Sequence, residues 1–409
     1  MSDDAPPLAV QLADALLLTV DEAAQHTAWG MWDWCRPQYQ RAADLLRELQ
    51  DDAVSASVAK LTAEPGDLAA YHETVDALTI AAAQDANAGW WRECRRVATG
   101  LRTTARIAVH VGSRVGERPV VPDLGIEEIA GGGDRSAARP GAAPVRASII
   151  IPFRAAAGDG RARNLAACLA ALDDQSVPRR DYRVVVVESD SRPRWREVFE
   201  PLADTYLFAR NPGRFNKSWA VNCGAVHGGA PDDLVCVLDA DMLVGADFIA
   251  RAVAAFDDDT LQGHWPFRDV VFADADSSRY AVAARCRDRS PDVDQELLRG
   301  TRLRRPPGGC IWLRRSLFRR IAGMDERFAG WGGEDNDLGW RAELYGGLER
   351  FGRQLIHLDH ARPTHRDDSG AAFHEAIPWC TWPTDSVIGD LDKYPEVTSG
   401  GNTRRDHHQ

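Results

Sequence analysis

From residue 147 onward, short β-branched runs alternate with segments of helical composition, and this alternation constrains the fold more than any other feature of the chain. The runs ASIIIPF, YRVVVVES and DLVCVLDAD are typical of strands. Helical patterns follow them at residues 162–175, 217–229 and 245–256. A repeated strand and helix predicts a mainly parallel sheet with helices on both faces. Such sheets bind ligands at the carboxyl ends of their strands, so functional residues are expected there.

The first third of the chain has a different texture. Residues 8–112 are rich in Ala, Leu, Glu and Arg, and their apolar residues recur at spacings of three and four, which predicts helices. The next stretch is rich in Gly, Ala, Pro and Ser, which is typical of a linker. We therefore expect an all-helical N-terminal domain (1–126), a linker (127–146), an α/β domain (147–370) and a C-terminal extension with a disordered tail (371–409).

Length and composition limit the functional class. A chain of 409 residues exceeds the usual single core, which favours two domains. Its net charge of −12 disfavours nucleic-acid binding. No run approaches the ~20 apolar residues that span a bilayer, and the acidic start argues against a secretory signal, so we expect a cytoplasmic protein without a transmembrane segment. The eight cysteines form no C-x-x-C pair, so neither a zinc ribbon nor a disulfide framework is indicated.

Two features leave alternatives open. The tryptophans of the helical region could line an acceptor or partner surface, including that of a homodimer, or could pack between helices (Trp29, Trp32, Trp34, Trp90 and Trp91). The basic stretches 299–307 and 314–320 could be solvated faces balanced by nearby acids, or could contact an anionic donor or acceptor.

A pair of carboxylates follows the third strand run. Asp239 and Asp241 lie two residues apart, so in extended backbone they face the same side. Two such carboxylates repel each other unless a cation lies between them, and a hard divalent ion with oxygen ligands is the usual solution. The alternative interpretation is turn capping.

Three further stretches carry residues suited to binding or catalysis. The run IPFR ends the first strand of the α/β part with a proline, an aromatic ring and a guanidinium, which could meet a base and a phosphate or form an incidental salt bridge. GRFNKSWAVNCGA is a loop that enters a helix with Phe215, Asn216 and Lys217 at its mouth. GWGGEDNDLGW places acids behind a glycine run whose backbone can close over a ligand.

In this order, IPFR, FNKSWAVNCG, DAD and GWGGEDND resemble the motifs of the GT-A nucleotide-sugar glycosyltransferases, especially the β-1,4-galactosyltransferase and bacterial chondroitin-polymerase type. The resemblance covers roughly residues 147–366. It implies a GT-A fold, a UDP-sugar donor and Mn²⁺, with Mg²⁺ as a substitute. The loop AAAGDGRAR departs from the shorter polar turn of these relatives, which puts nucleotide contacts from that loop in doubt.

The resemblance also assigns roles to residues. It implies a nucleotide-sugar site lined by Pro152, Phe153, Arg154, Glu188, Phe215, Asn216, Lys217, Asp239, Gly308, Gly309, Trp331 and Gly333. It implies a metal held by Asp241 with Asp239 beside it and a histidine added, for which His360 fits best and His357 and His365 are alternatives. It implies Asp335 as the general base and Glu334 facing the acceptor, while Asp337 holds the loop or caps the following helix.

The expected activity is metal-dependent, inverting transfer of a hexose or N-acetylhexosamine, with galactose or N-acetylgalactosamine preferred, to a hydroxyl of a saccharide or small molecule. One alternative is a retaining transferase of the N-acetylgalactosaminyl type. The other is a non-catalytic protein that binds sugar nucleotides.

Overall fold

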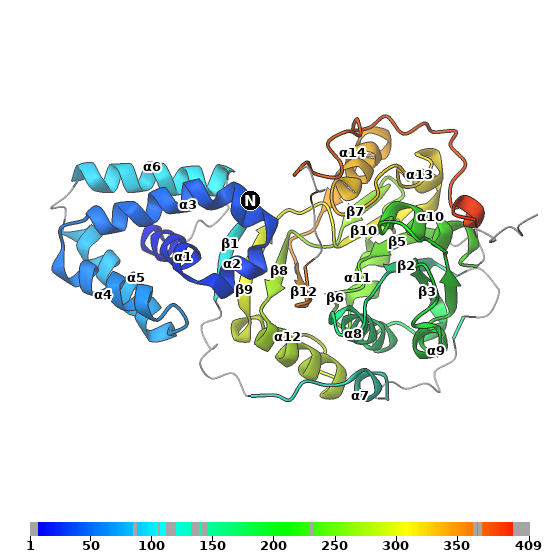
Figure 1. Ribbon diagram of the computed structural model, residues 1–409, viewed down its shortest axis with the longest axis horizontal. Helices are drawn as coiled ribbons and strands as arrows, with labels where there is room; N and C mark the ends of the chain where they lie inside the picture. Colours follow the sequence, from blue (N-terminus) through cyan, green and yellow to red (C-terminus); the bar gives the residue numbers. More distant parts are fainter. Residues whose placement is uncertain are drawn as a thin grey trace, which may run out of the picture.

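The structure is a computed structural model, and it describes residues 7–84, 88–104, 107–111, 120–131, 139–140, 145–229, 233–362, 366 and 370–395. Figure 1 shows a lobe of helices beside a larger α/β part. Within the described residues, no helix combines the length and apolar character needed to cross a membrane. Seven cysteines are buried and Cys380 is exposed.

A seven-stranded sheet forms the centre of the α/β part. Its order is β11-β7-β10-β5-β2-β3-β4, and β5, β2, β3 and β4 are parallel neighbours, whereas β10 runs antiparallel to both β5 and β7. The strands are β2 (Ala147–Phe153), β3 (Tyr182–Glu188), β4 (Thr205–Phe208), β5 (Leu234–Leu238), β7 (Gly263–Trp265), β10 (Cys310–Arg314) and β11 (Glu349–Arg350). The predicted mainly parallel sheet is confirmed.

Helices cover both faces of this sheet, as its continuous apolar strands require. Alternate residues of β2 face opposite cores: Ile149 and Ile151 pack with α8, whereas Ile150 packs with Trp219 of α10. The helices of this part are α8 (Arg161–Asp173), α9 (Arg196–Phe199), α10 (Lys217–His227), α11 (Phe248–Ala255), α12 (Ala275–Val282), α13 (Arg315–Arg320) and α14 (Glu334–Gly346), with short turns η2 (Arg179–Asp181), η3 (Glu200–Leu202), η4 (Ala283–Arg287), η5 (Gln295–Leu297) and η6 (Leu391–Lys393).

A second sheet stands between this core and the helical lobe (Figure 1). Its order is β1-β9-β8-β12-β6, with β8 and β12 parallel and the other neighbours antiparallel. The strands are β1 (Ile107–Val111), β6 (Met242–Leu243), β8 (Asp269–Ala273), β9 (Arg299–Arg304) and β12 (Gln354–His357). Periodicity in the sequence could not reveal this sheet, because its strands come from distant parts of the chain.

The N-terminal helical region is confirmed, and three of its helices begin at an aspartate whose carboxylate accepts from backbone N–H groups (Asp21, Asp51 and Asp67). The helices are α1 (Leu8–Val20), α2 (Glu22–Ala28), α3 (Gly30–Glu48), α4 (Asp52–Ala63), α5 (Leu68–Ala83) and α6 (Ala88–Thr104). They enclose a core of their own. The region is not all-helical, however, because β1 follows α6 and pairs with β9 of the α/β part.

The structure describes part of the expected linker and part of the expected extension. The linker stretch begins within α7 (Ile126–Gly131), where Ile129 is buried in the core that α8 also contributes to. In the extension, the Trp382 indole donates to the Ala322 carbonyl at 2.8 Å, and Gly389 donates to Glu326 at 2.7 Å. The first part of the extension is therefore ordered against the domain. The predicted disordered tail lies outside the described residues.

Candidate active site

The carboxyl end of β5 meets strand β6 at the edge of the two sheets. Asp239 donates its backbone N–H to the Gly309 carbonyl at 3.0 Å, and Leu358 donates to the Asp241 carbonyl at 2.9 Å. The antiparallel pairing of β6 with β12 sets His357 opposite Met242. This register brings the end of β12 beside the aspartate that precedes β6.

A possible metal site results from this pairing. His360 Nε2 lies 3.0 Å from Asp241 Oδ2, and His357 Nε2 lies 3.5 Å from Asp241 Oδ1. One ligand atom from each of the three residues can be chosen so that all lie within 4.8 Å of one another. Carboxylate and imidazole are suitable ligands for a divalent transition metal.

The surroundings of the three side chains fit a cation. His360 Nδ1 lies 2.7 Å from the Ala361 carbonyl, a contact that fixes the ring with Nε2 toward Asp241. Asp241 Oδ1 is buried without a hydrogen-bond partner. Burial lowers the pKa of His357 to about 3, although Asp241 beside it acts in the opposite direction. Burial alone would raise the pKa of Asp241, but His357, the hydrogen bond from His360 and nearby Arg362 hold that pKa well below its usual range.

Lys217 joins the strand end to the acidic loop. Its Nζ lies 2.6 Å from Asp239 Oδ1, and 2.8 and 2.9 Å from the two carboxylate oxygens of Asp335. Burial alone would lower the pKa of Lys217, but Asp239, Asp335 and Glu334 outweigh it and hold that pKa well above its usual range. The side chain is thus a permanent cation, and the two motifs that the sequence analysis brought together are in contact.

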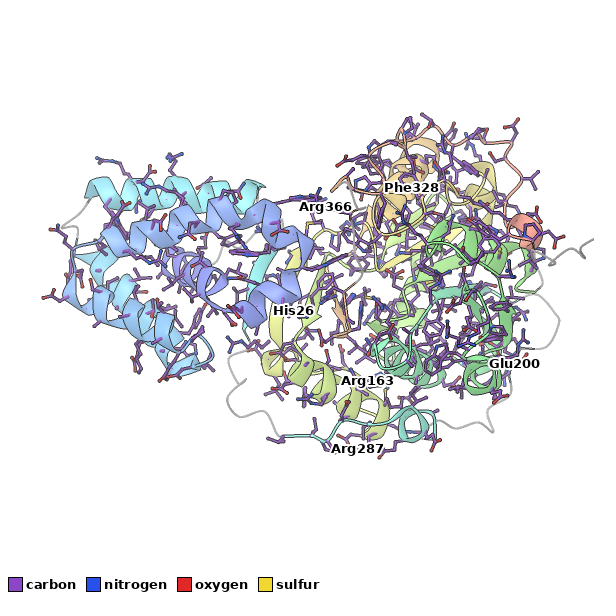
Figure 2. The ribbon with its side chains drawn as sticks, in the orientation of Figure 1. His26, Arg163, Glu200, Arg287, Phe328 and Arg366 are labelled. Atoms are coloured by element: carbon purple, nitrogen blue, oxygen red, sulfur yellow. The ribbon has the colours of Figure 1, made fainter. Side chains whose placement is uncertain are left out.

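The glycines of the site give its backbone close approach. A Cβ on Gly308 would lie 2.3 Å from Asp335 Oδ2, so only glycine leaves room for that carboxylate. Gly333 adopts φ +95° immediately before α14, and a Cβ there would meet Phe328, which Figure 2 labels beside α14, at 2.7 Å. The glycine run therefore sets the first turn of α14, which carries the acids.

Those acids have different surroundings. Glu334 Oε2 is buried without a hydrogen-bond partner, and burial together with Asp335 raises the pKa of Glu334 to about 7. Asp337, in contrast, accepts from Arg341 at 2.6 Å and from the Cys380 backbone N–H at 2.7 Å. Asp337 thus ties α14 to the C-terminal extension, in keeping with the structural role expected for it.

Comparison with known proteins bears on this part of the chain. Residues 148–322 match the family described as Glycosyl transferase family 2, and residues 301–363 match the family described as N-terminal domain of galactosyltransferase. This part of the chain is therefore similar to the family 2 glycosyltransferases. The expected enzyme class and GT-A fold are thereby confirmed, whereas the galactosyltransferase type is only suggested.

Individual relatives cover part of the chain. Validoxylamine A glucosyltransferase of Streptomyces hygroscopicus subsp. jinggangensis (strain 5008) is 29% identical over 229 residues, which is 49% of this chain and 51% of that protein. The chain therefore spans about half the length of that relative. Among solved structures, S. aureus TarS 1–349 matches at 14% identity and TM-score 0.36, over 52% of this chain and 60% of that chain. GalNAc-T7 with UDP, GalNAc and Mn²⁺ matches at 15% identity and TM-score 0.37, over 54% and 44%.

Arg154 connects three loops at the carboxyl edge of the glycosyltransferase domain. Its guanidinium donates to the carbonyls of Ser189, of Gly213 at 2.7 Å and of Asn211 at 2.9 Å, and it lies over the Phe215 ring at 5.5 Å. Burial lowers its pKa from the ordinary arginine value. These donors are directed at backbone, so in this structure Arg154 holds these loops together.

Four residues expected in the nucleotide-sugar site have structural surroundings instead. The Phe153 ring is buried in the core at 5.4 Å from Phe199, because its side of β2 faces α8, and Pro152 beside it is also buried. Both carboxylate oxygens of Glu188 are occupied, one by the Arg194 backbone N–H at 2.9 Å and one by the Tyr206 hydroxyl. Asn216 caps α10 at Trp219 N and donates to the Glu326 carbonyl, each at 2.8 Å.

The unusual loop AAAGDGRAR contacts the histidine segment. Arg161 donates to the Ala361 carbonyl at 2.6 Å, Ala361 donates to the Asp159 carbonyl at 3.1 Å, and Asn164 donates to the Asp359 carbonyl at 3.0 Å. The loop therefore supports the backbone on both sides of His360. The difference between this loop and the shorter turn of the relatives was the sequence signal for its supporting role. His365, the third histidine considered, lies outside the described residues.

Trp331 of the acidic loop contacts the helical region. Its ring contacts the Trp29 ring of the helical region edge to face, with centroids 3.9 Å apart and planes at 72°. Gly330, before it, donates to the Phe215 carbonyl at 2.8 Å. Gly309, immediately before β10, adopts φ +99°, and a Cβ there would meet Met242 at 2.9 Å. From the sequence, Trp29 could either line an acceptor or partner surface or pack between helices.

Proposed function

We propose that the chain is a metal-dependent, inverting glycosyltransferase that moves a hexose or N-acetylhexosamine from a UDP-sugar to a hydroxyl of a saccharide or small-molecule acceptor. The Lys217 bridge is the observation that carries the proposal, because it joins Asp239 of the strand end to Asp335 of the acidic loop. Asp241, two residues from Asp239, belongs to the histidine cluster. In this proposal, one edge of the domain therefore holds both the metal and the base.

The metal ligands in this proposal are Asp241, His360 and His357, with Asp239 beside them. The orphaned Oδ1 of Asp241 and the ring orientation of His360 fit such a cation. Bound there, Mn²⁺ or Mg²⁺ would act as a Lewis acid toward the departing diphosphate.

Asp335 is the proposed general base. Its two oxygens accept from Lys217, which fixes the position of the carboxylate. From there it removes the proton of the attacking acceptor hydroxyl. Glu334, whose pKa is raised to about 7 by burial, positions a hydroxyl of the acceptor through its free oxygen. A single base on the side opposite the leaving group inverts the anomeric configuration.

The donor is proposed as a UDP-hexose. The galactosyltransferase match favours galactose or N-acetylgalactosamine, whereas the name of the glucosyltransferase relative favours glucose. Validoxylamine A, which that relative's name gives as its acceptor, is the first acceptor to test.

The test is UDP release from UDP-Gal, UDP-GalNAc, UDP-Glc and UDP-GlcNAc, with Mn²⁺ and with a chelator, followed by NMR of the product anomer. We expect metal-dependent release and an inverted product. Asp335→Asn should reduce transfer by about 10²- to 10⁴-fold while UDP still binds. Asp288→Asn is the matched control, because Asp288 pairs with Arg287 on the surface.

Three outcomes would contradict parts of this proposal. A retained anomeric configuration would indicate the retaining N-acetylgalactosaminyl type. UDP binding without release from any donor would indicate a non-catalytic sugar-nucleotide-binding protein. Full activity of Asp335→Asn would remove that residue as the base.

A further inference from the structure

The helical region is fixed to the glycosyltransferase domain by buried polar contacts. Arg299 of β9 pairs with Asp21 and donates to the Pro65 carbonyl at 2.7 Å. Thr301 of β9 donates to the Ala24 carbonyl at 3.0 Å and contacts the hydroxyl of Thr27. Figure 2 labels His26 of α2 at this junction. Helix α2 is therefore held in place immediately before Trp29.

Trp29 itself has an unusual backbone. It lies between α2 and α3 with φ 50° and ψ −137°, and its N–H donates to the carbonyls of Gln25 and His26. A bulky residue at positive φ is an outlier, since its Cβ is crowded there, and such strained positions cluster at functional sites. Neither neighbouring helix needs a tryptophan at this turn, because glycine would adopt it more easily.

The turn directs the ring to the acidic loop. Trp29 and Trp331 are both half-buried and in edge-to-face contact. Trp331 precedes Glu334 by three residues and the proposed base Asp335 by four. Of the other tryptophans of the region, Trp32 and Trp91 are buried at 5% and 4% exposure and Trp34 is 58% exposed. Trp90 is half-buried, but it packs on Trp91 and donates to the Leu45 carbonyl within the helical region.

We infer that Trp29 and Trp331 together form an aromatic wall that binds the ring of the acceptor, so that the helical region takes part in acceptor choice. The electron-rich face of an indole attracts the C–H groups of a saturated, hydroxyl-bearing ring. The ligand class is therefore an acceptor with a pyranose or similar polyhydroxylated ring. This inference rests on the proposed function, since it places the acceptor beside Glu334.

The test removes the Trp29 ring without straining the turn. Trp29→Gly tolerates the positive φ. Trp29→Ala, which keeps the Cβ of the wild type, is the second variant should glycine unfold the region, and Trp29→Phe restores a ring. Trp34→Ala is the matched control, because Trp34 lies exposed on α3. The probes are validoxylamine A and the p-nitrophenyl β-pyranosides of glucose, galactose and N-acetylglucosamine. Two quantities are measured: acceptor KM at saturating donor, and donor hydrolysis without acceptor.

We expect Trp29→Gly to raise acceptor KM about fivefold or more with unchanged donor hydrolysis, and Trp29→Phe to recover most of the loss. Unchanged acceptor KM would overturn the inference, and so would an equal fall in donor hydrolysis, because the ring would then act only through stability. If the wild-type protein releases no UDP, the proposed function fails by itself, and quenching of tryptophan fluorescence by the same probes decides the inference. Quenching that Trp29→Gly abolishes supports the wall; no quenching of the wild-type protein refutes it.

Discussion

Asp239 and Asp241 lie two residues apart at the same strand end, yet their surroundings are opposite. Asp239 contacts the ammonium of Lys217, whereas Asp241 contacts two imidazoles. Burial raises the pKa of Asp239 to about 7 despite Lys217, while the groups around Asp241 hold its pKa well below the usual range. The pair therefore has two kinds of contact: Asp239 belongs to an ion-pair network that reaches the proposed base, and Asp241 belongs to the proposed set of metal ligands.

The largest effect is expected from removing the proposed metal ligands. Asp241→Ala should reduce kcat/KM at least about 1000-fold, because Lewis-acid stabilisation is worth several kcal/mol. His360→Ala should weaken Mn²⁺ activation in the same direction. Initial rates over a Mn²⁺ titration test both variants against Asp239→Asn, which should alter activity without moving the Mn²⁺ requirement. An identical Mn²⁺ response in all three would show that the two aspartates are not distinct.

The next largest effect is expected from removing Lys217, the cation that Asp239 and Asp335 share. Lys217→Met leaves Asp239, Asp335 and Glu334 without their cation, and loss of one partner of a buried pair costs about 3–5 kcal/mol. Urea unfolding at pH 7.5 measures the free energy of unfolding. The loss should shrink at pH 5.5, where Asp239 and Glu334, whose pKa values are raised to about 7, accept protons. Lys393→Met, which removes the 28% exposed partner of Glu326, is the control and should cost less. Equal losses for the two lysines would count against a special role for Lys217.

A smaller effect is expected from displacing only the proposed base, Asp335. Gly308→Ala should lower kcat by about 100-fold, since a displacement of about 1 Å at a reacting group has that effect. The reason is the 2.3 Å approach between the new Cβ and Asp335 Oδ2. Gly352→Ala is the control, because a Cβ there has no neighbour within 4 Å. Mn²⁺ affinity should be unchanged in both, and a shift in that affinity would mean that the two clusters respond as one.

The smallest effect concerns stability and pH. Burial raises the pKa of Glu334 to about 7 in the folded protein from its ordinary value of 4.5, so the stabilising contribution is full below the ordinary value and is lost as pH rises through about 7. We expect wild type to lose about 1–2 kcal/mol relative to Glu334→Gln between pH 5 and pH 8. Thermal unfolding of both proteins across that range measures it, with Glu200→Gln as the exposed control. Parallel curves would contradict the raised pKa.

Much of the glycosyltransferase domain could be predicted because its signals are local. The strand over residues 147–153 and the helix from Lys217 follow from β-branched runs and helical periodicity within a few residues. The proximity of Asp239 and Asp335 was also predictable, because the order of their motifs along the chain resembles that of a family in which these motifs form one site. The side-chain partners of Phe153 and Glu188 were not predictable, because residue type alone cannot distinguish a ring that lines a ligand from one that packs on Phe199.

By itself, the sequence determined the alternation that builds a parallel sheet and the chemical groups available at its edge. These properties depend on neighbours along the chain, through backbone preference and side-chain charge. Only the tertiary structure decided that β6 and β12 pair to place His357 and His360 at Asp241, and that α2 docks on β9 to bring Trp29 to Trp331. Those contacts join residues more than 100 positions apart, and they depend on how the sheets and helices pack, which no local pattern encodes.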